Sequence, residues 1–577
     1  MAAVRSRLQK LTVERLNGEN LKPVEENPES KKAEFLLAKR TPASLPQLPG
    51  KKELRLETMD RLSDLPKHIL HNILSRMPLR DRVRTSVLSK TWNHTCSTFP
   101  ILDFSQDRYV QLDNPENIED VERERNNFIN HVDKTLTRFH NQGLAIRELK
   151  LRMRYSDSQS IHSLFDYWMR LAVESGVQVL DLGQRICGNG SAENYCLPPC
   201  ILEAKSLTKL NLFGSIRVDH AFMNNPIQFS SLQVLSLWFV SLGGEQIIQN
   251  IISSCPLIEH LTLYQCGELK SLRIQGLHRL KRVMTSHINE IDIDAPNLEV
   301  FWYEQDPDGA PFNINLDKCR NLRGLYLLSV RPIIISDKWL LELFHKFPLL
   351  ERLKLDDCWF SERIKISSAL LKNLELEIRK CANLKEVIID APNLCSLRFY
   401  SPYKMPILSI FKSSSVLQIN VNLKLTVYWD FQKLREFLQS FEQRDILATL
   451  SLEIDLLSEE EFNLEELRDI PVSPPCIKHM DLNIYSQTPV LHLVTSLLWS
   501  CCPATISIPL LNRTCYSVVK VLEEMLTGRK LDECYCNSSD IKCWWHGLKD
   551  VKVTRTLENV GSAYPAGVAT VTFQLEY

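Results

Sequence analysis

The chain has 577 residues, enough for a large core and for more than one domain. Apolar residues make up 44% and charged residues 24% of it, which is typical of a soluble globular protein. The formal net charge is −1, so the composition argues against wholesale binding to nucleic acid or to an anionic membrane.

The cysteines and the apolar segments bear on the compartment. Seventeen cysteines are scattered without a regular framework, and the first residues lack the apolar core of a signal peptide. We therefore expect reduced thiols in the cytoplasm and/or the nucleus. The longest apolar candidate, residues 490–511, is interrupted by His492 and Pro503 among other polar residues, so no membrane span is predicted.

Residues 1–58 are predicted to form a disordered N-terminal tail. They hold five prolines and few aromatic residues, with twelve basic and eight acidic side chains, a net charge of +4. Such a segment cannot bury enough apolar surface to stay ordered. Its paired basic residues could serve nuclear import, although a solvated tail is the simpler interpretation.

Residues 59–105 contain three short helical patterns. Asp64 is positioned to cap the first, with Pro66 in its first turn, and Pro78 ends that helix. A second apolar stripe follows, and Trp92 lies in the third segment. The unit has more apolar side chains than so few residues can bury, which indicates a docking surface.

The order of these elements resembles an F-box, the module that docks a substrate receptor onto the Skp adaptor of a cullin-type ubiquitin ligase. The Leu-Pro start, the Ile-Leu-x-x-Met-Pro-Leu-Arg-Asp middle and the Val-Leu-Ser-Lys-Thr-Trp end match the plant form best. Thr91 and residues 94–96 depart from the family pattern. The resemblance implies that adaptor binding and the module's own core share the residues Leu65, Pro66, Ile69, Leu70, Ile73, Leu74, Leu79, Val83, Val87 and Trp92.

Beyond residue 140 a short x-Leu-x-Leu phrase recurs. It begins at Leu149-Lys150-Leu151, and the first leucines of successive phrases are 31, 30, 25 and 26 residues apart. Longer, degenerate units are expected between residues 263 and 325. Alternating leucines predict a short strand that shows every second side chain to a core, and the spacing is close to that of leucine-rich repeats.

Other phrases recur with the same spacing. Helical segments before Pro256, Pro348 and Pro503 are each followed by a predicted strand, and Asp-Ala-Pro-Asn-Leu occurs at residues 294–298 and 390–394. One such unit cannot bury its apolar face alone, but a stack can. We cannot phase the repeats between residues 408 and 475.

Together these segments resemble the plant F-box proteins with leucine-rich repeats. The resemblance implies an α/β fold: a small helical F-box followed by a curved leucine-rich-repeat solenoid with a C-terminal strand cap. Residues 551–553 and 571–575 are expected to pair in that cap. The predicted divisions are a tail (1–58), an F-box (59–105), a linker with the first repeat helix (106–145), leucine-rich repeats (146–530) and a cap (531–577).

Cysteines offer the main alternative chemistry. Cys534, Cys536, Cys543 and His546 have residue types that suit zinc, but their spacing is tighter than usual and no second pair follows, so we predict buried thiols and no metal. Cys266 and Cys358 each follow a predicted strand by three residues, where a small polar group meets the backbone at a turn. We expect them to be structural.

The resulting hypothesis is a non-catalytic adaptor without cofactors. It would be the substrate-recognition subunit of a Skp-cullin-F-box ubiquitin ligase, with the Skp adaptor, through it a cullin, and an unidentified protein substrate as partners. No nucleic acid or membrane is expected. A repeat scaffold with a degenerate F-box is the alternative, supported by Thr91 and residues 94–96, and a zinc-dependent or small-molecule receptor is a more distant one.

The repeats also predict a specific register. Residues between the leucines, Ser236, Thr262 and Lys354, should face outward on the concave surface. The side chains expected in one continuous core are Leu235, Leu237, Leu261, Leu263, Leu353 and Leu355.

Overall fold

The structure is a computed structural model. It describes residues 65–106, 118–155, 159–186, 194–306, 311–330, 333–378, 383–401, 406–411, 418–425, 434–435, 438, 447–454, 476–484, 497–498, 500–510, 513–527, 548–558 and 568–576. The predicted tail and the four residues weighed as zinc ligands (Cys534, Cys536, Cys543 and His546) lie outside these ranges.

Three short helices open the described chain: α2 (Lys67–Ser75), α3 (Leu79–Thr85) and α4 (Lys90–Ser97). Pro66 is the residue before α2, so it occupies the N-cap position and Asp64 lies outside the described residues. Ser89 caps α4, because its Oγ accepts a hydrogen bond of 3.2 Å from the Trp92 amide. Proline at two helix starts and serine at the third therefore set the boundaries of this helical unit.

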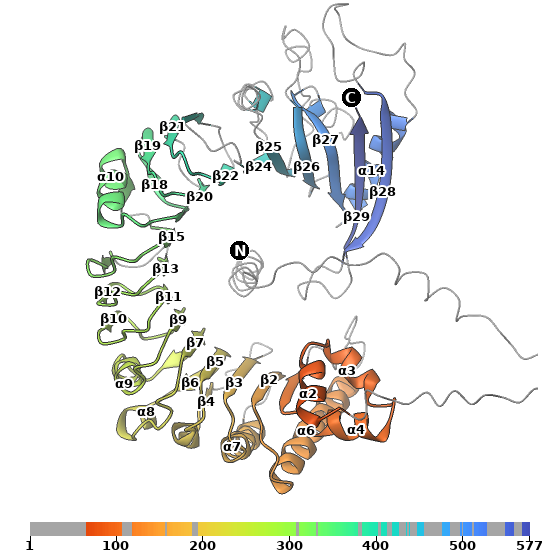
Figure 1. The fold of residues 1–577 in the computed structure, drawn as a ribbon, viewed down its shortest axis with the longest axis vertical. Coiled ribbons are helices and arrows are strands. Elements are labelled where there is room, and N and C mark those ends of the chain that lie inside the picture. Colours follow the sequence, from red (N-terminus) through yellow and green to blue (C-terminus); the bar gives the residue numbers. More distant parts are fainter. Residues whose placement is uncertain are drawn as a thin grey trace, which may run out of the picture.

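One long sheet runs through the rest of the molecule and curves into an arc (Figure 1). Adjacent strands of this sheet pair in parallel from β1 to β27, and each strand belongs to the repeat after that of its neighbour. The strands in spatial order are β1 (Ile101–Ser105), β2 (Glu148–Tyr155), β3 (Val179–Ile186), β5 (Lys209–Gly214), β7 (Val234–Trp238), β9 (His260–Tyr264), β11 (Arg282–Ser286), β13 (Val300–Glu304), β15 (Gly324–Leu328), β17 (Arg352–Asp356), β20 (Asn373–Glu377), β22 (Ser396–Ser401), β24 (Gln418–Leu425), β25 (Leu447–Ile454), β26 (Cys476–Ile484), β27 (Cys502–Pro509), β29 (Val568–Glu576) and β28 (Asp550–Glu558).

Helices lie on the outer side of the arc and the long sheet lines its inner side (Figure 1). The helices are α6 (Ile118–Asn141), α7 (Gln159–Glu174), α8 (Ala221–Asn224), α9 (Gln246–Ser254), α10 (Asp337–Lys346) and α14 (Arg513–Thr527), with a 3-10 turn at Pro199–Glu203. Short strands complete the remaining repeats: β4 (Tyr195–Cys196), β6 (Ile216–Val218), β8 (Ser241–Leu242), β10 (Ser271–Ile274), β12 (Glu290–Ile293), β14 (Asn313–Asn315), β16 (Ile334–Ile335), β18 (Trp359–Phe360), β19 (Arg363–Ser367), β21 (Glu386–Asp390) and β23 (Ile407–Phe411). This is the expected helical unit followed by a curved α/β solenoid.

The core lies between the long sheet and the outer elements. The six leucines predicted to point inward are all buried, and they belong to one continuous hydrophobic cluster. They are in register across the strands, since Leu235 pairs with Leu261 and Leu237 with Leu263. Ser236, Thr262 and Lys354 are partly exposed on the opposite, concave face. The predicted register is confirmed.

The expectation of longer, degenerate units between residues 263 and 325 is wrong. Two regular strands, β11 and β13, lie there, and the register runs from Leu261 through Val283 and Phe301 to Leu325. These steps are shorter than the first ones in the chain. The leucine phrase failed to reveal them because valine, phenylalanine and tyrosine fill the core positions instead.

The repeated Asp-Ala-Pro-Asn-Leu phrase forms the same turn twice. The alanine and the leucine are buried in both copies. The side-chain amide of Asn297 donates to the His278 carbonyl, and that of Asn393 donates to the Ala369 carbonyl, each at 2.7 Å. In both copies the asparagine of the phrase therefore satisfies a backbone carbonyl of the preceding repeat.

The C-terminal strands close the end of the sheet. β28 and β29 form an antiparallel hairpin, and β29 also pairs antiparallel with β27. The predicted pairing of residues 551–553 with 571–575 is confirmed. A parallel stack otherwise ends on an unpaired edge, which the hairpin covers on the β27 side. In the segment that could not be phased, β24 and β25 continue the parallel ladder.

The core register predicts a contrast between neighbours. Leu261→Ala should lower the free energy of unfolding by about 2–5 kcal/mol, because a fully buried leucine leaves a cavity. Thr262→Ala, one residue further on the same strand, should change it by less than about 1 kcal/mol. Urea unfolding followed by circular dichroism measures both. Equal losses at the two positions would contradict the assignment of inward and outward faces.

Candidate functional site

The helical unit has its own small core, separate from that of the repeats. Leu70, Leu74, Trp92 and Phe99 are buried in one cluster, with Leu65 and Ile73 partly buried against it. The apolar face of α2 and the tryptophan of α4 thus pack against each other inside the unit. Of the residues predicted for adaptor docking, these five side chains (Leu65, Leu70, Ile73, Leu74 and Trp92) hold the module together in the free protein.

A second set of predicted residues faces solvent. Ile69 on α2 is 37% exposed, Val83 on α3 is 62% exposed, and Val87 in the turn after α3 is 85% exposed. Pro66 is also exposed, and the side chain of Leu79 lies outside the described part of the chain. Leu88, which the sequence reasoning left off the docking set, is 68% exposed. Such exposure of aliphatic side chains on so small a unit indicates an interface.

Phe99 links the helices of the unit to one another. The His71 ring lies edge-on to it with centroids 5.6 Å apart, and the Arg82 guanidinium lies 5.2 Å from its centroid. Burial and the charge of Lys67 lower the pKa of His71. The neutral ring is thereby favoured. Lys67 and Lys90 are exposed cations of the unit, whereas Arg84 lies 3.6 Å from Asp81 in an ion pair.

The helical unit is joined to the repeats by strand pairing and hydrogen bonds. The strand β1 follows Phe99 by two residues and pairs with β2, the first leucine strand. The Pro100 carbonyl accepts hydrogen bonds from the Arg147 and Glu148 amides at 2.8 and 3.1 Å. Arg138 on α6 donates to the Ser97 carbonyl at 3.1 Å. The last residues of the docking unit are therefore the first strand of the sheet.

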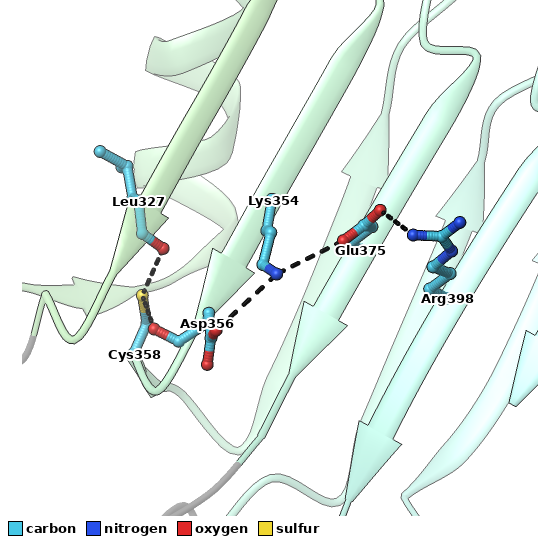
Figure 2. Close-up of polar contacts among 6 residues, drawn as sticks. All are labelled: Leu327, Lys354, Asp356, Cys358, Glu375 and Arg398. Atoms are coloured by element: carbon cyan, nitrogen blue, oxygen red, sulfur yellow. Dashed lines mark hydrogen bonds and ion pairs between the residues drawn. The ribbon is translucent and has the colours of Figure 1, made fainter. Parts of the chain in front are cut away.

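The concave face carries an ion-pair chain across three strands (Figure 2). Lys354 Nζ lies 3.8 Å from Asp356 and 3.5 Å from Glu375, and Arg398 donates to Glu375 at 2.9 Å. The Lys354 side chain is only 18% exposed. Charge reversal there would gather three carboxylates, so Lys354 supports the sheet as well as facing the concave surface.

Cys266 and Cys358 occupy the predicted strand-end turns. Each is buried, and each thiol donates to a carbonyl of the preceding repeat: Leu237 at 3.6 Å and Leu327 at 3.7 Å (Figure 2 shows the latter). Burial raises the pKa of each thiol to about 12. These cysteines are neutral structural donors, because a nucleophilic cysteine needs a depressed pKa.

A hydroxyl, an imidazole and a carboxylate line up on β26 and β27. His479 Nδ1 contacts Thr505 Oγ1, and His479 Nε2 lies 2.7 Å from Asp481 Oδ1. The Thr505 hydroxyl donates to the Lys478 carbonyl at 3.1 Å, so its oxygen accepts from the imidazole. The Asp481 carboxylate can only accept, so Nε2 carries a proton and donates to it. These contacts join the side chains of β26 and β27 across the sheet.

Within the described ranges, no group of three or more His, Cys, Asp or Glu side chains could hold a metal ion. The same part of the chain has no helix that is both long and apolar enough to cross a membrane. The sequence reasoning missed a cluster of aromatic residues on the concave side of β7 to β15, which includes the partly exposed Trp238 and the buried Trp302. A strand-by-strand register, rather than a count of apolar residues, would have revealed them.

The imidazole contacts predict a pH effect. The hydrogen bond to Asp481 raises the pKa of His479 above its ordinary value of 6.5. The interaction of the protonated imidazole with Asp481 therefore stabilises the fold. This stabilisation is complete below about pH 6.5 and is lost as the pH rises through the pKa of His479 in the folded state. Thermal unfolding at pH 6 and pH 8 should show the loss in the wild type and a smaller one in Asp481→Asn. The same pH dependence in both proteins would contradict this assignment.

Comparison with known proteins agrees with this geometry. The family model described as "At1g61320/AtMIF1, LRR domain" matches residues 136–313 and 311–452, which together make up more than half of the chain. The F-box domain model matches residues 62–104, the range of the three helices.

Individual relatives contain both parts. The F-box/FBD/LRR-repeat protein At1g78750 of Arabidopsis thaliana is 25% identical over 73% of this chain and 97% of its own length. F-box/LRR-repeat protein 13 of the same plant is 25% identical over 58% of this chain and 77% of its own. F-box/LRR-repeat protein At2g42720 is 29% identical over 45% and 56%. The chain belongs to the plant F-box/LRR-repeat proteins.

Proposed function

We propose that this chain is the substrate-recognition subunit of a Skp-cullin-F-box ubiquitin ligase. The observation that carries the proposal is the exposure of four aliphatic side chains on the F-box: Ile69, Val83, Val87 and Leu88. None of them belongs to the core of the F-box. Apolar side chains that the molecule does not bury itself are what a constitutive partner would cover.

The attachment of the F-box supports a positioning role. Because β1 is both the end of the F-box and a strand of the repeat sheet, the docking face and the concave face keep a fixed relation. A ligase subunit of this kind accelerates transfer by proximity: a target lysine held near the charged conjugating enzyme reacts at a high effective concentration. F-box/LRR proteins are generally adaptors without catalytic residues of their own.

We also propose that the protein works in the cytoplasm or the nucleus, on the basis of its cysteines. The twelve cysteines in the described part of the chain are free thiols, several of them buried. Reduced thiols suit the cytoplasm or the nucleus.

The Skp adaptor would present a surface of complementary chemistry to the F-box. We expect this surface to be apolar at its centre and acidic at its border, opposite Lys67 and Lys90.

The test is adaptor binding by surface variants. Val83→Asp or Val87→Asp should weaken binding of purified Skp adaptor by about 30-fold or more, since a removed apolar anchor costs about 2 kcal/mol. Ile407→Asp is the matched control, because Ile407 is 69% exposed on β23 in the repeats. It should bind the adaptor as the wild type does in isothermal titration calorimetry.

Two outcomes would contradict the proposal. Wild-type affinity in both F-box variants would place the interface elsewhere. Failure of the unmodified chain to bind any Skp adaptor would favour the alternative, a repeat scaffold with a degenerate F-box. The departures from the family pattern at Thr91 and residues 94–96 support that alternative; Thr91 and His94 are exposed, whereas Cys96 packs against the F-box core.

A further inference from the structure

A separate apolar cluster lies on the concave face of β7, β9, β11, β13 and β15. Its members project from the side of the strands opposite to the leucine core, as the register requires: Met284, Trp302 and Tyr326 are paired neighbours between the core rows. We call it the aromatic strip. It consists of Trp238, Phe239, Tyr264, Met284, Trp302, Tyr326 and Leu328.

The strip is a continuous packed floor. The ring centroids of Trp238 and Tyr264 are 4.7 Å apart, and those of Tyr264 and Trp302 are 5.7 Å apart. Tyr264, Met284 and Trp302 are buried by their neighbours, whereas Trp238 and Tyr326 remain partly exposed. Elsewhere on the concave face the same positions hold polar residues such as Lys354 and Glu375. Aromatic side chains gathered where the fold needs only polar ones mark a contact surface.

Phe239, at one end of the strip, has a backbone conformation that is unfavourable for an aromatic residue. Phe239 has a φ of 59°, a left-handed conformation that is uncommon for a bulky side chain. Gln265, His287 and Ser329 take the same conformation at other strand ends, so the turn recurs, but they are polar. A phenylalanine in this turn is more costly than glycine or asparagine would be. Its ring instead extends the strip, lying 5.5 Å from the Tyr264 ring.

Charge is unevenly distributed between the two ends of the strands that carry the strip. Glu304 lies in the register row at their carboxyl ends, which also holds Tyr264 and Leu328, and Asp356 and Glu377 continue this row beyond the strip on β17 and β20. Tyr264 donates to Glu304 at 2.7 Å, so this carboxylate touches the strip itself. The amino ends of the strands carry arginines instead, among them Arg282 and Arg352. A ligand lying across the strip would therefore meet carboxylates toward the carboxyl ends of the strands and arginines toward their amino ends.

We propose that the aromatic strip binds an extended segment of the target protein that combines apolar side chains with lysine or arginine. The apolar side chains would lie on the strip, and the cations would face Glu304 and Glu377. This inference rests on the proposed function and names the class of segment that the repeats recognise. The carboxylates disfavour the alternative of stacked single-stranded nucleic acid, whose phosphates they would repel.

The probe is a random 12-residue display library selected on the intact chain. Enriched peptides should combine apolar residues with Lys or Arg. One of them is then synthesised, together with a partner peptide in which every Lys and Arg is replaced by Glu. Fluorescence anisotropy measures both on the wild type, Trp238→Ala, Tyr326→Ala and Glu377→Lys. The matched control is Trp359→Ala, because Trp359 is 47% exposed on β18, outside the strip.

We expect Trp238→Ala and Tyr326→Ala to weaken binding of the basic peptide by about tenfold or more. Trp359→Ala should leave its affinity within about twofold of the wild type. Glu377→Lys should shift the preference toward the acidic peptide. The strip variants should remain folded, with melting temperatures lowered by at most a few degrees, and their binding of the Skp adaptor should stay at the wild-type value. Adaptor binding tests the F-box alone, so failure of the ligase assignment and failure of the strip are separable.

Several results would overturn the proposal. They are the enrichment of acidic or purely polar peptides, the enrichment of none, or equal loss in Trp359→Ala. Tighter binding of a 12-nucleotide single strand than of the peptide would assign the strip to nucleic acid. Binding that appears only after deletion of residues 1–58, which carry a net charge of +4, would make the chain's own amino-terminal segment the occupant.

Discussion

The whole structure depends on the lateral pairing of short parallel strands whose alternate side chains are buried. No strand of five residues has enough apolar surface to stand alone, and each obtains its core by stacking on its neighbours. Leu235, Leu261 and Leu353 are fully buried only because the strands before and after them supply the same two rows. Curvature, the concave face and the position of the F-box all follow from this ladder.

Continuity of the ladder links the two functional regions. The F-box ends in β1, which is the first strand of the ladder, so the surface proposed for the adaptor and the surface proposed for the target are joined by one continuous sheet. The other end is closed by an antiparallel hairpin, which protects the edge beyond β27. The faces left open are the aliphatic surface of the F-box and the concave surface of the sheet.

Sequence alone predicted much of this, because the leucine phrase at Leu149, Leu235 or Leu353 carries the strand period directly. It failed at β11 and β13, where Val283 and Phe301 replace leucine in the same register. It also could not separate Ile69, which is exposed, from Leu70, which is buried, since both lie on one apolar helix face. The concave aromatic residues were missed for a related reason: in a sequence, Trp302 between Phe301 and Tyr303 is indistinguishable from a core residue.

Hydrogen exchange followed by mass spectrometry, on the chain alone and with the Skp adaptor, tests the central claim most directly, because local protection reports which elements a partner covers. The account predicts slower exchange in α2, α3 and the turn to α4, with β7 to β15 unchanged. Protection of the concave strands by the adaptor, or no protection of residues 67–97, would contradict it.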